Sequence, residues 1–181
     1  MYVACGSLNK ITEKQVEYAE KTGGFERIHL TMEQKLMPEY YQSRQGKEFT
    51  EWLVKLCETR RKLIVDTFDQ DDKKEMFLEK HKIPKASVRF RISDSHGCIV
   101  DEILKSNIDV TILMTGGDTL MGYMKKIGCT QIEPLCEIEQ GIVASNIICH
   151  DHTVQVISKS GGFGTEDVMC IIAEKVIRKE S

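Results

Sequence analysis

The feature that most constrains this 181-residue sequence is a pattern that occurs three times: a short apolar run, a turn rich in glycine and hydroxyl groups, and a helical stretch. The clearest copy is "VISKSGGFGTEDVM" (156–169), and the others begin with "YVACGS" (2–7) and "DVTILMTGGDT" (109–119). Strands that alternate with helices build βαβ units, whose strands are parallel. We therefore predict an α/β fold: a three-layer, mostly parallel Rossmann-like sheet with helices on both faces.

The rest of the chain is expected to complete this one domain. The length favours a single domain over residues 1–181, because a chain of about 150 residues normally builds one core. Thr12 and Gln15 fit a capping box at the start of the first helix, and a further helix is expected from Thr165. The spacing of apolar residues predicts strands at 27–32 and 62–68 and helices around 49–56 and 92–104.

The three glycine turns are the candidate functional site. In parallel sheets the turn after a strand lies at the carboxyl edge, where open α/β folds bind ligands, and the first amides of the next helix favour anions. A single glycine turn often needs only a positive φ, but three in equivalent places favour a ligand. The candidate ligand-binding residues are Ser7, Gly116, Gly117, Asp118, Thr119, Lys159, Ser160, Gly161 and Gly162.

Charged groups near the turns suggest which residues would bind an anion and which would bind a metal ion. Lys159 and the amides of Gly161 and Gly162 would hold an anion, whereas Glu166 and Asp167 would repel it unless they face solvent or a Mg²⁺ shell. Asp118 could organise Mg²⁺ through water or merely complement the helix dipole. Thr119 would donate its hydroxyl to a phosphate.

Bulk properties exclude several classes of function. The formal charge of −3 and pI near 6.0 provide no basic field for nucleic acid or an anionic membrane. No export signal or apolar span of about 18 residues occurs. Seven cysteines without a CxxC spacing argue against zinc and against a secreted disulfide framework, and 149–152 ("CHDH") is interpreted as a surface loop. We expect a cytoplasmic, reduced protein without its own metal ligand set.

Standard nucleotide fingerprints are missing, since the sequence contains neither GxxxxGK[ST] nor a GxGxxG that opens the first helix. Four ordered segments nevertheless carry a resemblance: "CGSLNKITEKQVEYA", "MTGGDTLMGYMKKIG", "EIEQGIVASNI" and "VISKSGGFGTEDVM". Together they resemble the C-terminal nucleotide-binding domain of the four-carbon acid sugar kinase family, the tetronate kinases, formerly a domain of unknown function. The likeness spans essentially the whole chain.

The resemblance implies an ATP site at Ser7, Gly116–Thr119 and Gly161, with Mg²⁺ bridging phosphate oxygens. It implies phosphorylation of a tetronate such as threonate, erythronate or a 3-dehydro relative. The family's N-terminal domain, which holds the sugar acid and an acidic "DDxTG"-type motif, has no counterpart here, so we expect the chain to need that domain or a separate subunit and to be inactive alone. A second copy of the chain is a further potential partner.

Two other interpretations remain open from the residues. The chain could be a non-catalytic nucleotide-binding or regulatory module, or a domain that binds another phosphorylated metabolite. Selectivity for ATP separates the kinase and regulatory interpretations from the third.

Overall fold

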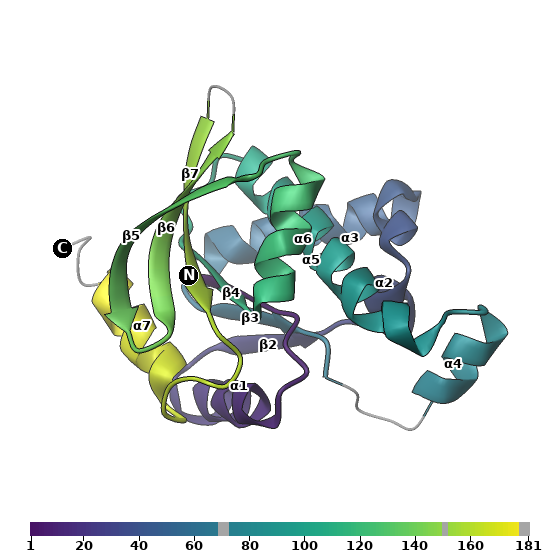
Figure 1. Ribbon diagram of the computed structural model, residues 1–181, viewed down its shortest axis with the longest axis horizontal. Helices are drawn as coiled ribbons and strands as arrows, with labels where there is room; N and C mark the ends of the chain where they lie inside the picture. Colours follow the sequence, from purple (N-terminus) through teal and green to yellow (C-terminus); the bar gives the residue numbers. More distant parts are fainter. Residues whose placement is uncertain (69–72, 150–151, 178–181) are drawn as a thin grey trace.

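The computed structural model describes residues 1–68, 73–149 and 152–177. Its sheet has seven strands in the order β2-β3-β1-β4-β7-β6-β5 (Figure 1). The strands β2, β3, β1, β4 and β7 run parallel, and β6 and β5 continue the sheet antiparallel. The strand bounds are β1 (Tyr2–Cys5), β2 (Glu26–His29), β3 (Leu63–Asp66), β4 (Ile112–Thr115), β5 (Gln131–Glu139), β6 (Ile142–Cys149) and β7 (His152–Lys159).

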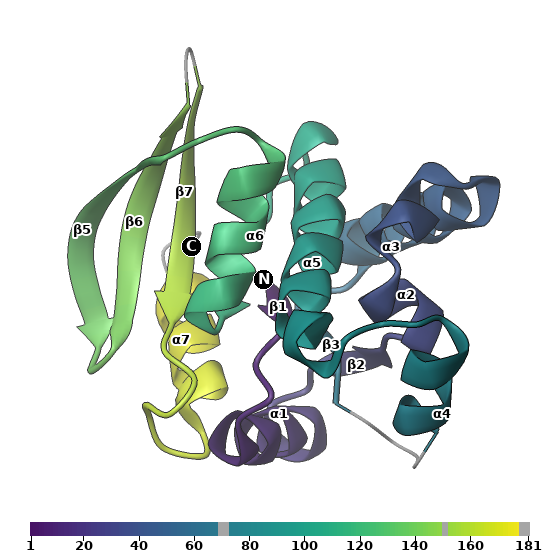
Figure 2. The ribbon, with the colours of Figure 1, turned by 45° about the vertical axis from the view of Figure 1, so that its right-hand side comes forward.

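Helices cover both faces of the sheet, which confirms the predicted three-layer, mostly parallel α/β fold. Figure 2 shows α5 and α6 side by side on one face, with α3 beyond them, whereas α1 and α7 lie on the other. The helices are α1 (Lys10–Thr22), α2 (Met32–Leu36), α3 (Arg44–Thr59), α4 (Lys74–Lys80), α5 (Val88–Lys105), α6 (Gly117–Lys126) and α7 (Val168–Ile177), with 3-10 turns η1 (Pro38–Gln42) and η2 (Lys85–Ser87).

The central strand β1 shows how the sequence builds two cores. Tyr2 and Ala4 belong to the apolar cluster under α3, α5 and α6, whereas Val3 and Cys5 belong to the cluster under α1 and α7. All four side chains are fully buried. Since successive side chains of a strand point to opposite faces, a continuously apolar run is what a strand covered on both faces requires.

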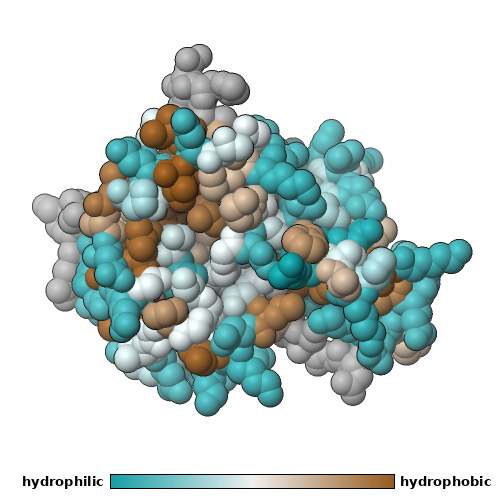
Figure 3. Space-filling view, viewed as in Figure 1, coloured by the Kyte–Doolittle hydropathy of each residue, from teal (hydrophilic) through white to brown (hydrophobic). Residues whose placement is uncertain are grey.

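The hairpin of β5 and β6 was not predicted from the sequence. The nine-residue strand β5 lies at the edge of the sheet, and its register is interrupted on both sides of Cys136. Pro134, which cannot donate to a ladder, also lies in it. Exposed apolar side chains occur here at Ile132, Leu135 and Ile148, and Figure 3 shows hydrophobic surface gathered on this side of the molecule. An exposed, irregular edge strand lacks the apolar run that identifies buried strands.

Two helix starts also differ from the predictions. The first helix begins at Lys10, and its cap is Asn9, whose side chain accepts a hydrogen bond from the amide of Ile11. The last helix begins at Val168 rather than at Thr165. Gly164, with a φ of +88°, turns the chain just before that helix, so the residues that follow it lie in the turn.

Candidate functional site

The three glycine turns meet at the carboxyl edge of the sheet. β1 and β4 are neighbours, but the chain continues from β1 toward β3 and β2 and from β4 toward β7, so the strand order reverses between them. A crevice of this kind is where open α/β sheets bind ligands. A Cβ on Gly116 would lie 3.6 Å from Ser7, and one on Gly161 would lie 2.9 Å from the Ser7 Oγ. Thus Ser7 touches both of the other turns.

The turn between β4 and α6 is shaped by glycine. Gly116 has φ 87° and ψ 131°, a backbone conformation that side chains rarely adopt. A Cβ on the next residue, Gly117, would meet nothing within 4 Å. The amides of Gly117 and Asp118 belong to the first turn of α6, where a helix supplies no backbone acceptor. This turn therefore combines open space with amides that can bind an anion.

The side chains of this turn differ in what they can offer a ligand. The buried hydroxyl of Thr119 donates to the carbonyl of Thr115 at 2.8 Å, so in this structure its proton is used within the turn. Asp118 is exposed. Its carbonyl accepts a hydrogen bond from the hydroxyl of Ser93 on α5, which ties the start of α6 to its neighbouring helix.

The turn between β7 and α7 is held by side chains of α1. The hydroxyl of Thr12 donates to the carbonyl of Gly161 at 2.7 Å. The amide group of Gln15 donates at 2.9–3.0 Å to the carbonyls of Phe163, Gly164 and Thr165. The predicted capping box is therefore wrong, because both side chains make tertiary contacts and leave the cap to Asn9.

Lys159 ends β7 beneath this turn. Its side chain is buried, and its ammonium donates to the carbonyl of Ser160 at 3.0 Å. Burial lowers the pKa of Lys159 to about 8. Within the described ranges no carboxylate lies within ion-pair distance of it. A buried cation without a carboxylate partner gains most from an anion that binds nearby.

The outer part of this turn is open. Ser160 and Gly162 are exposed, and the nearest atom to a Cβ on Gly162 would be the Nδ2 of Asn9 at 3.9 Å. Sequence reasoning missed Asn9, although a polar residue directly before a helical pattern is the usual cap signal. Glu166 and Asp167 precede α7 instead of forming its first turn, and Asp167 accepts a hydrogen bond from the hydroxyl of Thr165.

The floor of the crevice contains two more residues, Gly6 and His96, which were not among the predicted site residues. A Cβ on Gly6 would lie 2.5 Å from the Thr119 Oγ1 and 3.0 Å from the His96 ring, so close packing requires glycine at this position. His96 is fully buried, and among the described residues neither ring nitrogen has a hydrogen-bond partner. Burial lowers the pKa of His96 to about 4, so the ring is neutral at pH 7.

The remaining features concern metal ligands, membrane spans and cysteines. The described ranges contain no group of three or more metal-ligating side chains and no helix that could cross a bilayer. The predicted loop at 149–152 lies partly outside the described residues. Burial raises the pKa of the Cys5 thiol to about 12. Cys129 is disulfide-bonded, in contrast to the expectation of a fully reduced chain.

A family model described as "Nucleotide-binding C-terminal domain" matches residues 2–169. No curated protein matches the sequence.

Solved structures share the fold at low identity. A Haemophilus influenzae protein, HI1011, of the DUF1537 family has a TM-score of 0.70 and 19% identity over 97% of this chain and 39% of its own. A DUF1537 protein of Bordetella bronchiseptica, described as a domain-swapped dimer with bound citrate, has a TM-score of 0.67 and 16% identity over 96% of this chain and 38% of its own. The chain therefore spans about two fifths of the length of these two structures.

Proposed function

Since the chain belongs to the family of nucleotide-binding C-terminal domains, we propose that it is the ATP-binding domain of a kinase that phosphorylates a four-carbon sugar acid such as threonate or erythronate. The observation that carries the proposal is the meeting of three glycine turns at Ser7, in the crevice where the strand order reverses. The ordered sequence motifs, which resemble those of the tetronate kinases, support the choice of ATP and of the sugar acid.

The residues divide into those that would face ATP and those that hold the turns. Gly117 and Gly162 are open, so the backbone there can approach a phosphate closely. Lys159 would add positive charge beneath the phosphates. Ser7 and Thr119 would shape the wall of the crevice, because their hydroxyl groups already donate to Thr12 and Thr115. Phosphoryl transfer depends mainly on such positioning and on neutralisation of charge.

Mg²⁺ fits this site only as a partner of the phosphates. Asp118 is exposed beside the open Gly117, and in the described part of the chain no cluster of ligands accompanies it. Mg²⁺ usually keeps several waters and takes one or two carboxylates plus substrate phosphates. Asp118 would therefore hold the ion through water, and the ion would neutralise phosphate charge.

The proposal assigns the sugar acid and the proton acceptor to a different part of the enzyme. The described turns offer amides, hydroxyls and one ammonium, which are groups that can bind phosphate oxygens. On this proposal residues 1–181 form one nucleotide-binding domain, which is inactive without a sugar-acid-binding domain or subunit and works in the cytoplasm, where ATP is available. A second copy of the chain is a further proposed partner, as the Bordetella protein is described as a domain-swapped dimer.

Gly117→Val tests the nucleotide site directly. Valine meets no atom within 4 Å at its Cβ and needs no positive φ, so the fold should remain while the side chain occupies the space for the phosphates. We expect calorimetric titration with ATP and Mg²⁺ to show saturable binding to the unsubstituted chain and none to the variant. Inorganic phosphate and a sugar phosphate serve as control titrants.

Met121→Val is the matched control variant, because Met121 is exposed on the same helix α6. It should bind ATP like the unsubstituted chain, and both variants should keep their thermal midpoints. An unchanged ATP affinity in Gly117→Val would remove the β4–α6 turn from the site.

A further inference from the structure

Lys159 is unusual among the charged residues of the described ranges, because its side chain is 1% exposed and no carboxylate there lies within ion-pair distance of it. Burial lowers its pKa to about 8, so it is still mostly protonated at pH 7. A buried ammonium costs free energy that an apolar side chain of similar length would not. Groups of this kind are concentrated at functional sites, and the hydrogen bonds of Lys159 indicate its task.

The backbone groups of Ser160, the residue after Lys159, are both used inside the protein. The amide of Ser160 donates to the carbonyl of Gly141 at 3.0 Å. The carbonyl of Ser160 accepts from the amide of Phe163 at 3.2 Å and from the ammonium of Lys159 at 3.0 Å. The ammonium therefore helps to fix the direction in which this carbonyl points.

The next peptide units of the β7–α7 turn follow from that direction. The carbonyl of Gly161 accepts from the hydroxyl of Thr12 at 2.7 Å and lies 3.5 Å from the ammonium of Lys159. In a planar trans peptide the N–H points opposite to the carbonyl of the preceding residue. The amide of Gly161 therefore points away from the buried ammonium, and the amide of Gly162 points away from Thr12. Within the described ranges neither amide donates to a protein acceptor.

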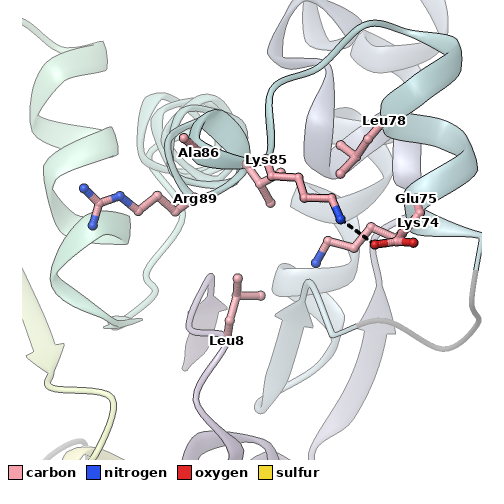
Figure 4. A pocket seen from close by; sticks show the side chains of 8 residues that line it. Leu8, Lys74, Glu75, Leu78, Lys85, Ala86 and Arg89 are labelled. Atoms are coloured by element: carbon pink, nitrogen blue, oxygen red, sulfur yellow. Dashed lines mark hydrogen bonds and ion pairs between the residues drawn. The ribbon is translucent and has the colours of Figure 1, made fainter.

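The space beside these amides is open. Gly162 is exposed, and a Cβ on it would meet only the Nδ2 of Asn9 within 4 Å. Leu8, which lies between Ser7 and Asn9 in the sequence, points elsewhere: it lines a separate cavity beside α4 and α5 (Figure 4). Successive amides that point out of a turn form a concave site for an anion.

We propose that Lys159 is a positioning residue: its ammonium holds two carbonyls of the β7–α7 turn, so that the amides of Gly161 and Gly162 face the phosphates of the nucleotide. The proposal rests on the proposed function and deepens it, because it separates the groups that bind the phosphates from the group that orients them. The charge of Lys159 acts from beneath the turn, and its protons go to carbonyl oxygens. To bind a phosphate directly, the ammonium would have to leave both carbonyls.

The backbone of Lys159 also joins this turn to the neighbouring one. Its carbonyl accepts from the amide of Gly116 at 2.8 Å. That hydrogen bond does not involve the side chain, so a substitution of Lys159 should leave the β4–α6 turn in place. The amide of Gly117 in the β4–α6 turn is therefore an internal reference for the test.

Lys159→Met tests the positioning role, because methionine is of similar length and has neither a charge nor a donor. The ¹⁵N-labelled unsubstituted chain and the variant are each saturated with ATP and Mg²⁺, and the amide resonances are followed by NMR. In the unsubstituted chain we expect the amides of Gly117, Gly161 and Gly162 to shift. In the variant we expect Gly117 to shift as before and Gly161 to lose most of its shift. The affinity for ATP should fall about tenfold, the effect of one hydrogen bond lost at a charged group.

The measurement at saturation separates positioning from direct binding. If Lys159 merely supplied a charge to the phosphates, saturation of the variant would restore the full shift of Gly161, and this result would overturn the proposal. Lys126→Met, at an exposed lysine of α6, removes the same charge and should keep the affinity and all three shifts. Thr12→Val removes the other donor to the carbonyl of Gly161, so it should reduce the shift of Gly162 more than that of Gly161. The reverse order would contradict the assignment of the two amides.

A crystal structure of the unsubstituted chain with bound ATP needs no variant. We expect the Lys159 ammonium to remain on the carbonyl of Ser160 and the amides of Gly161 and Gly162 to donate to phosphate oxygens. An ammonium that donates to a phosphate oxygen instead would overturn the positioning role. If ATP binds but neither amide faces it, the positioning role fails while the proposed function stands. If calorimetry detects no binding of ATP to the unsubstituted chain, both proposals fail.

Discussion

The β4–α6 and β7–α7 turns of the site each contain a glycine with positive φ, but they are held in place by different means. The β4–α6 turn contains Gly116 with φ 87° and leads directly into its own helix, where the hydroxyl of Ser93 donates to the carbonyl of Asp118. The β7–α7 turn contains Gly164 with φ 88°, and side chains of α1 hold this turn in place by donating hydrogen bonds to four of its carbonyls. The first turn is determined locally, whereas the second depends on residues about 150 positions away.

This difference indicates where the site is rigid and where it depends on the rest of the fold. A helix start keeps its amides in place because the helix itself orients them. A longer loop of exposed glycines has no such support, since glycine gains the most freedom on unfolding. Thr12 and Gln15 provide that support, so α1 acts on the site although it contributes no glycine turn of its own.

The largest effect is expected for Gln15→Met, which keeps the size of the side chain and removes its amide. Three carbonyls of the β7–α7 turn would lose their donor, and we expect the free energy of unfolding to fall by about 2–4 kcal/mol. Urea denaturation measures it. Lys14→Met, at an exposed position of the same helix, should change stability little. Equal stabilities of the two variants would show that α1 does not hold the turn.

Alanine at the two positive-φ glycines sharpens the comparison. Both changes strain the backbone, at about 1–3 kcal/mol each. Gly164→Ala should cost more, because its Cβ would lie 2.8 Å from Val168, whereas that of Gly116 would have its nearest contact at 3.6 Å. Thermal and urea unfolding of the two variants measure the order. The reverse order would mean that the β4–α6 turn is the more constrained one.

The sequence predicted the parts of the fold that depend on local pattern. Apolar runs within 62–68 and 109–114 indicated strands, and the glycine turns, such as the one after 109–114, indicated the carboxyl-edge site. The hairpin escaped notice because β5 is exposed at the edge and contains Pro134. An apolar run in the sequence predicts a buried strand, but the pairing of exposed β5 with β6 cannot be predicted from such a run.

The sequence predicted the glycine turns of the candidate site, but not that the side chains of Thr12 and Gln15 hold one of these turns in place. Thr12 and Gln15 have the spacing of a capping box, and the same two groups can satisfy either the helix start or a distant loop. Here they bind the loop, because both side chains are fully buried beneath it and need partners there, while exposed Asn9 can cap the helix. His96 lies in a polar stretch, 92–97, that could face a ligand, but it was not predicted as a site residue because a histidine within a helical pattern does not reveal what lies above it.

The next prediction concerns the pH dependence of stability, which tests the buried ammonium of Lys159 beneath the β7–α7 turn. Burial lowers the pKa of Lys159 to about 8, from about 10.4 in an unfolded chain. Between these values the unfolded chain binds more protons than the folded one, so stability should rise with pH above 8, by up to about 1.4 kcal/mol per unit. Urea midpoints of the unsubstituted chain and Lys159→Met at pH 7–10 measure this. A constant difference between them would contradict the buried ammonium.

The smallest effect is expected for Thr12→Val, which keeps the shape and removes one hydroxyl. The carbonyl of Gly161 would lose its donor, and the hydroxyl of Ser7, which donates to Thr12 at 3.2 Å, would lose its acceptor. We expect a loss of about 1 kcal/mol in the free energy of unfolding. Thr12→Ser keeps both hydrogen bonds and should lose less.

Because Ser7 links the first turn to the third through Thr12, Ser7→Ala combined with Thr12→Val should cost less stability than the sum of the two single changes. Strict additivity would show that the turns are held independently.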